Sequence, residues 1–184
     1  MNITPIQLSG CYLIEPKIFE DERGYFYESF NRSKFREQTD IDFDIVQENH
    51  SKSMKGVLRG LHFQIDQYAQ AKLVRCLFGE ILDLIVDLRK DSPTYGKHHS
   101  EILSEANKKQ LYIPKGFAHG FLILSDFAEF LYGVDHGYAP EFEQGLMYND
   151  PYFNIDWSTP SDNIILSDRD RKWPPFNLNH NYFD

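Results

Sequence analysis

Two histidines lie in segments where an imidazole could take or give a proton. His62 is flanked by leucine and phenylalanine in the segment 56–64, Gly-Val-Leu-Arg-Gly-Leu-His-Phe-Gln. His119 lies between Ala118 and Gly120, small residues that would let a ligand approach closely. Histidine is the side chain best suited to proton transfer near neutral pH. The pattern around His62 fits a general base and a hydrogen-bonded core histidine equally well.

Three further clusters combine polar groups with a turn or an aromatic strand. Residues 21–28 form an acidic turn with an arginine and a glycine before aromatic residues, which by composition favours a solvated turn and an edge strand. Tyr132 ends the run Glu-Phe-Leu-Tyr, where a tyrosine is most often a core residue with a hydrogen-bonded hydroxyl. Residues 166–170, Leu-Ser-Asp-Arg-Asp, taken alone are typical of a surface turn.

A metal site is not predicted, although small β-barrels with inward histidines often hold one. Such a site usually needs a His-x-His pair with a carboxylate and a later histidine, and Gln64 stands at the second position of the pair. His98 and His99 are adjacent, so they cannot both point to one face of a strand and are expected to be exposed.

The elements that must position these residues are mostly strands. Period-two patterns rich in β-branched and aromatic residues predict strands at 25–30, 44–49, 57–63, 73–78, 81–88, 110–113, 121–124 and 130–134. A helical pattern covers residues 32–38, Gly79 and Glu80 predict a hairpin turn, and a looser end begins at about residue 150. Many short strands with Gly, Pro and Asp turns predict an all-β sandwich or double-sheet barrel.

Alternation within the strands places polar side chains on the inner face of such a barrel. It predicts that Arg59 lies on the face of its strand opposite to His62 and Gln64. Asp83 and Asp87 should share one face of a later strand, opposite its leucines and valine. Buried polar groups are costly unless they are paired, so a barrel lined by them is expected to hold a polar ligand.

Length and charge limit the class of protein. The chain has 184 residues with 28 acidic and 19 basic side chains, so its formal net charge is −9. One domain over residues 1–184 is expected, and the acidic balance argues against nonspecific nucleic-acid binding. Cys11 and Cys76 lie far apart among apolar neighbours, which favours reduced core cysteines over a disulfide. The sequence has no signal-like or membrane-spanning apolar run, so a cytoplasmic protein is expected.

Taken together, these segments resemble the dTDP-4-dehydrorhamnose 3,5-epimerase family, which comprises nucleotide-sugar epimerases of the cupin superfamily. The resemblance runs from Asp21 to Asp170, most of the chain, and several long motifs occur in the family's order. The motifs are DERG at 21–24, QENHS at 47–51, GVLRGLHFQ at 56–64, QAKLVR at 70–75, DSPTYG at 91–96, IPKGFAHGF at 113–121 and LSDRD at 166–170.

The resemblance implies a cupin-type jelly-roll barrel with short peripheral helices, a homodimer, and catalysis without metal or organic cofactor. It implies that C3 and C5 of dTDP-4-dehydro-6-deoxy-D-glucose are inverted to give dTDP-4-dehydro-L-rhamnose. Both carbons flank the C4 ketone, so a base can remove either hydrogen to form an enolate, and an acid on the opposite face can return the proton. By the resemblance, His62 is the base, Asp170 orients it, and Tyr132 is the acid. Lys72 matches the cation near the enolate oxygen.

The resemblance also implies which residues bind the nucleotide sugar. They are Arg23, Arg59 and His119 for the diphosphate, Phe26, Glu28, Gln47 and Asn49 for the nucleotide, and Glu143 and Arg169 for further contacts. Arg169 stands where the family commonly has lysine. After Tyr132, Gly133 and residues 137–140 replace a lysine and a Tyr-Tyr-Ser-Pro run, so one aromatic wall near the nucleotide is expected to be missing.

Other functions remain open at this point. Relatives with the same fold invert only C3 or only C5, or move the ketone between C3 and C4. A metal-dependent cupin is another class, against which Gln64 argues. A non-catalytic sugar-binding module would not need His62 and Tyr132 together. Proton exchange with solvent and elemental analysis would separate these alternatives.

Overall fold

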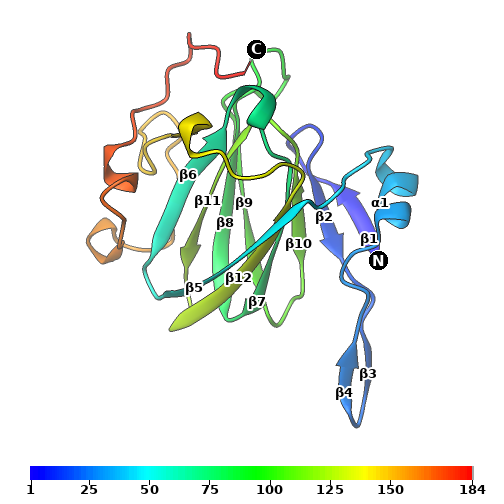
Figure 1. The fold of residues 1–184 in the computed structure, drawn as a ribbon. Helices are drawn as coiled ribbons and strands as arrows, with labels where there is room; N and C mark the ends of the chain where they lie inside the picture. The colour runs from blue at the N-terminus through cyan, green and yellow to red at the C-terminus, as the bar shows by residue number, and fades with distance from the viewer. Residues whose placement is uncertain (184) are drawn as a thin grey trace.

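Two antiparallel sheets face each other in the computed structural model, which describes residues 1–183 (Figure 1). Within this range, the six-stranded sheet has the order β1 (Asn2–Pro5), β2 (Tyr12–Glu15), β10 (Gln110–Ile113), β7 (Lys72–Phe78), β12 (Phe127–Val134) and β5 (Gln47–Met54). The five-stranded sheet of the same range has the order β13 (Glu143–Gly145), β6 (Leu58–Gln64), β11 (Phe117–Ile123), β8 (Glu80–Asp87) and β9 (His98–Ser104). The architecture is the expected cupin-type jelly-roll barrel.

The elements outside the barrel are short. β3 (Phe19–Asp21) and β4 (Gly24–Phe26) form a separate hairpin that projects from the body (Figure 1). Helix α1 (Arg32–Thr39) confirms the predicted helix: the Asn31 side chain accepts a hydrogen bond from the Lys34 amide, and Asp40 ends the helix in a left-handed conformation. Short 3-10 turns cover Asp66–Tyr68, Pro140–Phe142, Ser161–Asn163 and Asp170–Lys172.

Both faces of the five-stranded sheet are covered. Ile81 and Ile85 of β8 pack into the core between the sheets, whereas Leu84 of the same strand packs on the outer face. The C-terminal segment covers that outer face and contributes Phe153 and Trp157 to its apolar cluster. Successive strand residues point to opposite faces, so β8 carries apolar side chains on both sides because both sides are buried. The C-terminal segment is therefore packed against the sheet that carries β6.

Several smaller predictions are confirmed. Cys11 and Cys76 are free and buried in the core between the sheets. Asp83 and Asp87 alternate with the outer-face residues of β8, as predicted, and Asp87 accepts hydrogen bonds from Arg89, from the Ser92 hydroxyl and from the Thr94 hydroxyl. Across the described part of the chain, no helix is long and apolar enough to cross a membrane.

The predicted hairpin at Gly79 and Glu80 is wrong. β7 pairs with β10 and β12, whereas β8 pairs with β9 and β11, so the turn carries the chain from one sheet to the other. Gly79 is required there: its φ is +76°, and an added Cβ would lie 2.3 Å from the Phe127 carbonyl oxygen. The strand predicted at 25–30 ends at Phe26, and the strand predicted at 44–49 begins at Gln47.

Candidate active site

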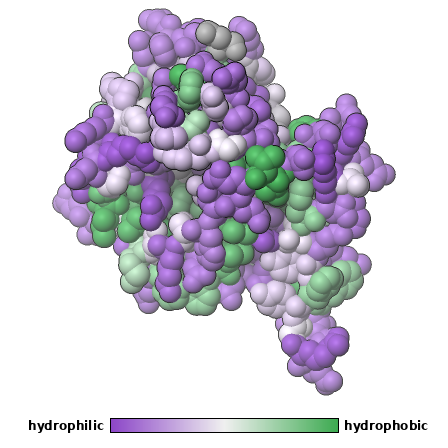
Figure 2. All heavy atoms as spheres, viewed as in Figure 1, coloured by the Kyte–Doolittle hydropathy of each residue, from purple (hydrophilic) through white to green (hydrophobic). Residues whose placement is uncertain are grey.

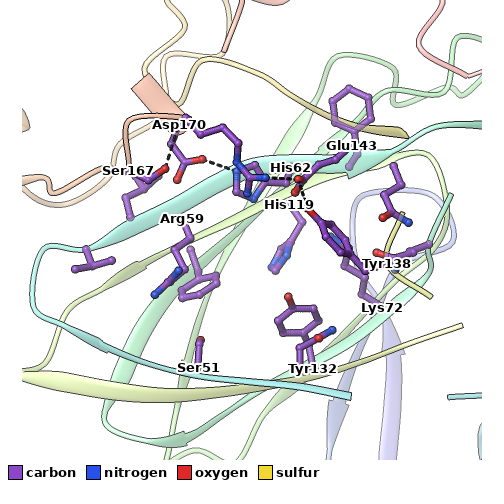
Figure 3. A pocket seen from close by; sticks show the side chains of 18 of the residues that line it. Ser51, Arg59, His62, Lys72, His119, Tyr132, Tyr138, Glu143, Ser167 and Asp170 are labelled. Carbon is purple, nitrogen blue, oxygen red and sulfur yellow. Dashed lines mark hydrogen bonds and ion pairs between the residues drawn. The ribbon is translucent and has the colours of Figure 1, made fainter. Parts of the chain in front are cut away.

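A cavity of about 780 Å³ opens between the two sheets (Figure 3). Its walls come from β5, β7 and β12 of the six-stranded sheet, from β6 and β11 of the five-stranded sheet, and from the C-terminal segment. Most of the predicted site residues line it, namely Gln47, Asn49, Arg59, His62, Lys72, His119, Tyr132, Glu143, Arg169 and Asp170. The barrel thus collects side chains that are up to about 120 residues apart in the sequence.

Arg59 and His62 both line the cavity, so the prediction that they lie on opposite faces of β6 is wrong. β11 pairs His119 with His62 and Phe121 with Arg59, so two steps along β11 match three along β6. This irregularity inserts one residue into β6 and reverses the alternation. The Arg59 guanidinium reaches the opposite sheet, where the Ser53 hydroxyl accepts its Nε and Nη2 hydrogen bonds at 3.2 and 3.1 Å.

His62 and Asp170 form a hydrogen-bonded pair at the cavity wall, with His62 Nε2 2.6 Å from Asp170 Oδ1 (Figure 3). Asp170 begins a 3-10 turn, and its amide donates a hydrogen bond to the Ser167 hydroxyl at 3.1 Å. Burial raises the pKa of Asp170, but hydrogen bonding led by His62 outweighs burial and holds the pKa below its usual value. The charged carboxylate favours a proton on Nε2, which leaves the ring's lone pair on Nδ1.

A second histidine–carboxylate pair lies deeper in the barrel. His119 Nε2 is 2.8 Å from Asp83 Oδ2, and the His119 side chain is 6% exposed compared with 21% for His62. Burial lowers the pKa of His119 and outweighs the opposing effect of the Asp83 charge. His119 is therefore neutral near pH 7, with its proton on Nε2 toward Asp83, so Nδ1 can accept a hydrogen bond from a ligand in the cavity.

Lys72 is the buried cation of the cavity. It begins β7 and is 8% exposed. Burial lowers its pKa from 10.5 to about 8, and the charges of Asp83 and Glu143 limit the decrease. Lys72 is thus mostly protonated at pH 7, in a place where water cannot screen its charge.

Tyr132 faces His62 across the cavity. Tyr132 lies on β12 of the six-stranded sheet and His62 on β6 of the five-stranded sheet, and both side chains point into the space between them (Figure 3). Burial raises the pKa of Tyr132, the Glu143 charge adds to the rise, and the Arg59 charge opposes it. The phenol therefore keeps its proton near neutral pH and can donate it.

The other predicted contacts gather at one end of the cavity. Glu143 accepts a 2.7 Å hydrogen bond from the Tyr138 hydroxyl and pairs with Arg169. The Gln47 amide donates to Asn49 Oδ1 at 2.8 Å, and its oxygen accepts the Tyr138 amide at 3.0 Å. These interactions hold the polar side chains in fixed orientations around the cavity.

The two positions after Tyr132 where the sequence departs from the pattern of the family it resembles have different structural consequences. A Cβ at Gly133 would lie 2.8 Å from Ile45, so the glycine makes room for packing. A Cβ at Gly137 would meet its nearest neighbour, Gln47 Oε1, at 3.9 Å, so the backbone there leaves open space beside Gln47.

Three predicted site residues do not reach the cavity of their own chain. Arg23, at the tip of the β3–β4 hairpin, pairs with Asp21, and Phe26 at its base is 70% exposed. Glu28 pairs with Lys34 beside helix α1. The structure therefore does not join the hairpin residues to the other predicted contacts.

Other residues of the site, Ser53, Ser167 and Trp173 among them, were not predicted. Ser53 holds Arg59, Ser167 accepts the Asp170 amide, and the Trp173 indole donates to Asp170 Oδ1 at 3.3 Å. Ser53 could be found by extending the alternation of Gln47 and Asn49 along β5. The sequence gives no such signal for Trp173, because its contact with Asp170 depends on the geometry of the 3-10 turn between them.

A metal centre is not formed by the described residues: within 1–183, no group of three or more His, Cys, Asp or Glu side chains could hold an ion. The Gln64 amide bonds instead to the backbone, donating to the Tyr68 and Gly137 carbonyls and accepting the Ala139 amide at 2.7 Å. His98 is exposed as expected, whereas His99 is half-buried.

Comparison with known proteins agrees with this geometry. The family model described as dTDP-4-dehydrorhamnose 3,5-epimerase matches residues 5–177. The dTDP-4-dehydrorhamnose 3,5-epimerase of Shigella flexneri is 51% identical over 170 residues, which cover 92% of this chain and 93% of the relative. The crystal structure of the Elizabethkingia anophelis NUHP1 epimerase is 49% identical with a TM-score of 0.94, and 99% of each chain is covered.

A further similar structure contains a ligand. It is the dTDP-6-deoxy-D-glucose-3,5-epimerase of Legionella pneumophila Philadelphia 1 in complex with dTDP-4-keto-L-rhamnose. It is 47% identical with a TM-score of 0.90, and 97% of this chain and 93% of that chain are covered. The match spans both sheets and the C-terminal segment that supplies Asp170. The chain belongs to the dTDP-4-dehydrorhamnose 3,5-epimerase family.

Proposed function

We propose that the chain inverts C3 and C5 of dTDP-4-dehydro-6-deoxy-D-glucose and forms dTDP-4-dehydro-L-rhamnose. The observation that carries this proposal is the position of His62 and Tyr132 on opposite walls of one cavity, with Lys72 on the same sheet as Tyr132. A proton removed from one face of a carbon and returned to the other inverts that carbon. The Legionella relative, solved with dTDP-4-keto-L-rhamnose, supports this substrate.

His62 is the base in this proposal, and Asp170 is its partner. His62 keeps part of its ring exposed to the cavity, whereas His119 is buried and already bonded to Asp83 at its Nε2. The Asp170 carboxylate keeps the proton on Nε2 and stabilises the imidazolium that forms when Nδ1 takes a proton from the sugar. Tyr132 then supplies a proton to the opposite face of the enolate.

Lys72 stabilises the enolate oxygen in the same proposal. A fixed charge in a site with little water acts mainly where negative charge develops. A base, an acid and this charge suffice for proton transfer beside a ketone, so the chemistry needs neither metal nor organic cofactor. The backbone bonds of Gln64 support this proposal, because they give the residue at the expected ligand position a structural use.

The remaining cavity residues bind the nucleotide sugar. Arg59 and His119 contact the diphosphate, for which the guanidinium fork of Arg59 is a suitable donor. His119 can donate to it only from Nδ1 of a protonated ring, because Nε2 already donates to Asp83. Gln47 and Asn49 offer amide donors and acceptors to the base, and Glu143 and Arg169 make further contacts.

A homodimer would explain the hairpin residues. The β3–β4 hairpin projects from the body, and Figure 2 shows apolar side chains above its hydrophilic tip. Phe19, Tyr25 and Phe26 are more than half exposed there, which is costly for a free hairpin and typical of a contact surface. We therefore assign Arg23, Phe26 and Glu28 to the cavity of a second copy of the chain.

Mixing two inactive variants tests this assignment. Arg23→Ala and His62→Asn are each purified, unfolded, mixed and refolded together. If hairpins cross between subunits, mixed dimers regain one intact site and about a quarter of all sites become active. If each hairpin serves its own subunit, the mixture stays as inactive as its components, and the crossed dimer is wrong.

The reaction itself is tested by incubation with dTDP-4-dehydro-6-deoxy-D-glucose in deuterated water, with label position and product read by NMR. We expect deuterium at C3 and C5 and the L-lyxo product. Label and inversion at one carbon would indicate a single-site epimerase, and no exchange would refute the proposal.

Residues 1–184 act as one domain, and the free, buried cysteines support a reducing compartment such as the cytoplasm.

A further inference from the structure

The indole of Trp173 touches the proposed His62–Asp170 pair from outside the cavity. Its Nε1 donates to Asp170 Oδ1 at 3.3 Å, and His62 Nε2 lies 2.6 Å from that same oxygen. The indole also meets the imidazole edge to face, with ring centroids 6.0 Å apart and an interplanar angle of 69°. Two N–H groups thus converge on one carboxylate oxygen and fix the direction in which it faces His62.

The seat of the indole is built into the strand beside His62. Gly145 of β13 pairs with His62 of β6, and a Cβ at Gly145 would lie 2.4 Å from the Trp173 ring. Only glycine leaves room for the indole at this position. The next residue is tied to the segment that follows β13, because the Pro174 carbonyl accepts the Met147 amide at 2.9 Å. Trp173 is therefore held by the same sheet that carries His62.

We propose that Trp173 is a positioning residue, which locks the Asp170 carboxylate in line with Nε2 of His62 and so keeps the imidazole lone pair on Nδ1. The proposal rests on the proposed function, in which His62 is the base. Trp173 is not among the described residues that line the cavity, so its loss should not weaken substrate binding directly. Its loss should slow proton removal, which depends on the orientation of the imidazole.

The experiment compares Trp173→Phe with Trp157→Phe. Trp157 is a matched control, because it lies in the same C-terminal segment, is buried, and donates its indole N–H to the Tyr148 carbonyl at 2.9 Å. We expect Trp173→Phe to lower kcat about tenfold and to change KM less than about twofold, the scale for an outer partner of a functional histidine. Trp157→Phe should retain the wild-type kcat.

A double-mutant cycle separates positioning from a general packing effect. If Trp173 acts through Asp170, then Trp173→Phe should not slow Asp170→Asn any further, whereas a packing defect would add to it. Gly145→Ala, which displaces the indole without removing its N–H group, should reproduce the kcat loss if Trp173→Phe folds poorly. Wild-type kcat in both Trp173→Phe and Gly145→Ala, or full additivity with Asp170→Asn, would overturn the proposal.

The same measurements keep this proposal distinct from the proposed function. Wild-type exchange in His62→Asn would refute His62 as the base. An inactive His62→Asn together with fully active Trp173→Phe and Gly145→Ala variants would refute the positioning role and leave the proposed base in place.

Discussion

Replacing Lys72 by methionine should make the protein more stable and less active. The side chain is 8% exposed, and burial lowers its pKa from 10.5 to about 8, so its charged form is disfavoured in the folded state. Methionine has a similar length, fills the same space and carries no charge. The substitution therefore removes an electrostatic penalty while keeping the apolar contacts of the side chain.

The size of the gain follows from the pKa change. One pKa unit corresponds to about 1.4 kcal/mol, so the depressed pKa of Lys72 represents about 3 kcal/mol of lost stability when the amine is charged in both states. That penalty is fully present below pH 8. Between pH 8 and 10.5 the folded protein releases the proton before the unfolded chain does, so wild-type stability rises with pH through this group.

Urea-induced unfolding followed by circular dichroism, at one protein concentration, measures this difference. Lys72→Met should be about 3 kcal/mol more stable than wild type at pH 7 and only about 1 kcal/mol more stable at pH 10. Lys115→Met is the control, because Lys115 is half exposed beside Asp135 and its replacement should change stability by less than about 0.5 kcal/mol at either pH. A gain that is absent at pH 7, or equally large at pH 10, would refute the reasoning.

The same substitution should cost activity. If Lys72 stabilises the enolate, its loss should lower kcat about a hundredfold, the scale for removing one preorganised transition-state contact. For the wild type, kcat/KM should fall as pH rises through about 8, where Lys72 loses its proton. A stabilised variant with full activity would mean that the buried charge has no part in the reaction.

Three further outcomes are expected. His62→Asn should lower kcat about a hundredfold while dTDP binding measured by calorimetry is retained; turnover near the wild-type rate would remove His62 as the base. Tyr132→Phe should still wash deuterium into recovered substrate while little inverted product accumulates, and equal losses of exchange and product would show that Tyr132 is not a separate acid. Dialysis against a chelator should leave activity unchanged, whereas a stoichiometric metal whose removal stops turnover would revive the metal-dependent alternative.

The barrel can be predicted from the sequence because alternation is a local property. β7, β10 and β12 lie where their period-two patterns predict strands, since each has one face in the core. Which sheet a strand joins is not local. The turn at Gly79 has the composition of a hairpin, yet long-range pairing with β10 and with β11 sends β7 and β8 to different sheets.

The site is predictable to a similar degree. Family motifs identify the residues that line the cavity. They do not reveal that β6 has one extra residue relative to β11, which turns Arg59 to the same face as His62. Trp173 and Ser167 are absent from the prediction because they contact Asp170 through a short 3-10 turn, whose geometry has no periodic signal. The hairpin residues show the opposite case: the motif is recognisable, and a single chain does not bring it to the cavity.

The two histidine–carboxylate pairs differ in burial because their carboxylates come from different parts of the fold. Asp83 lies on β8, next to the strand that carries His119, so sheet register alone buries both groups together. Asp170 arrives with the C-terminal segment, which packs on the outside of the five-stranded sheet, so the pair forms at the wall and leaves His62 in contact with the cavity. A proton-transfer base needs that access. In the proposed function, the same two residue types therefore serve binding in the buried pair and proton transfer in the pair at the wall.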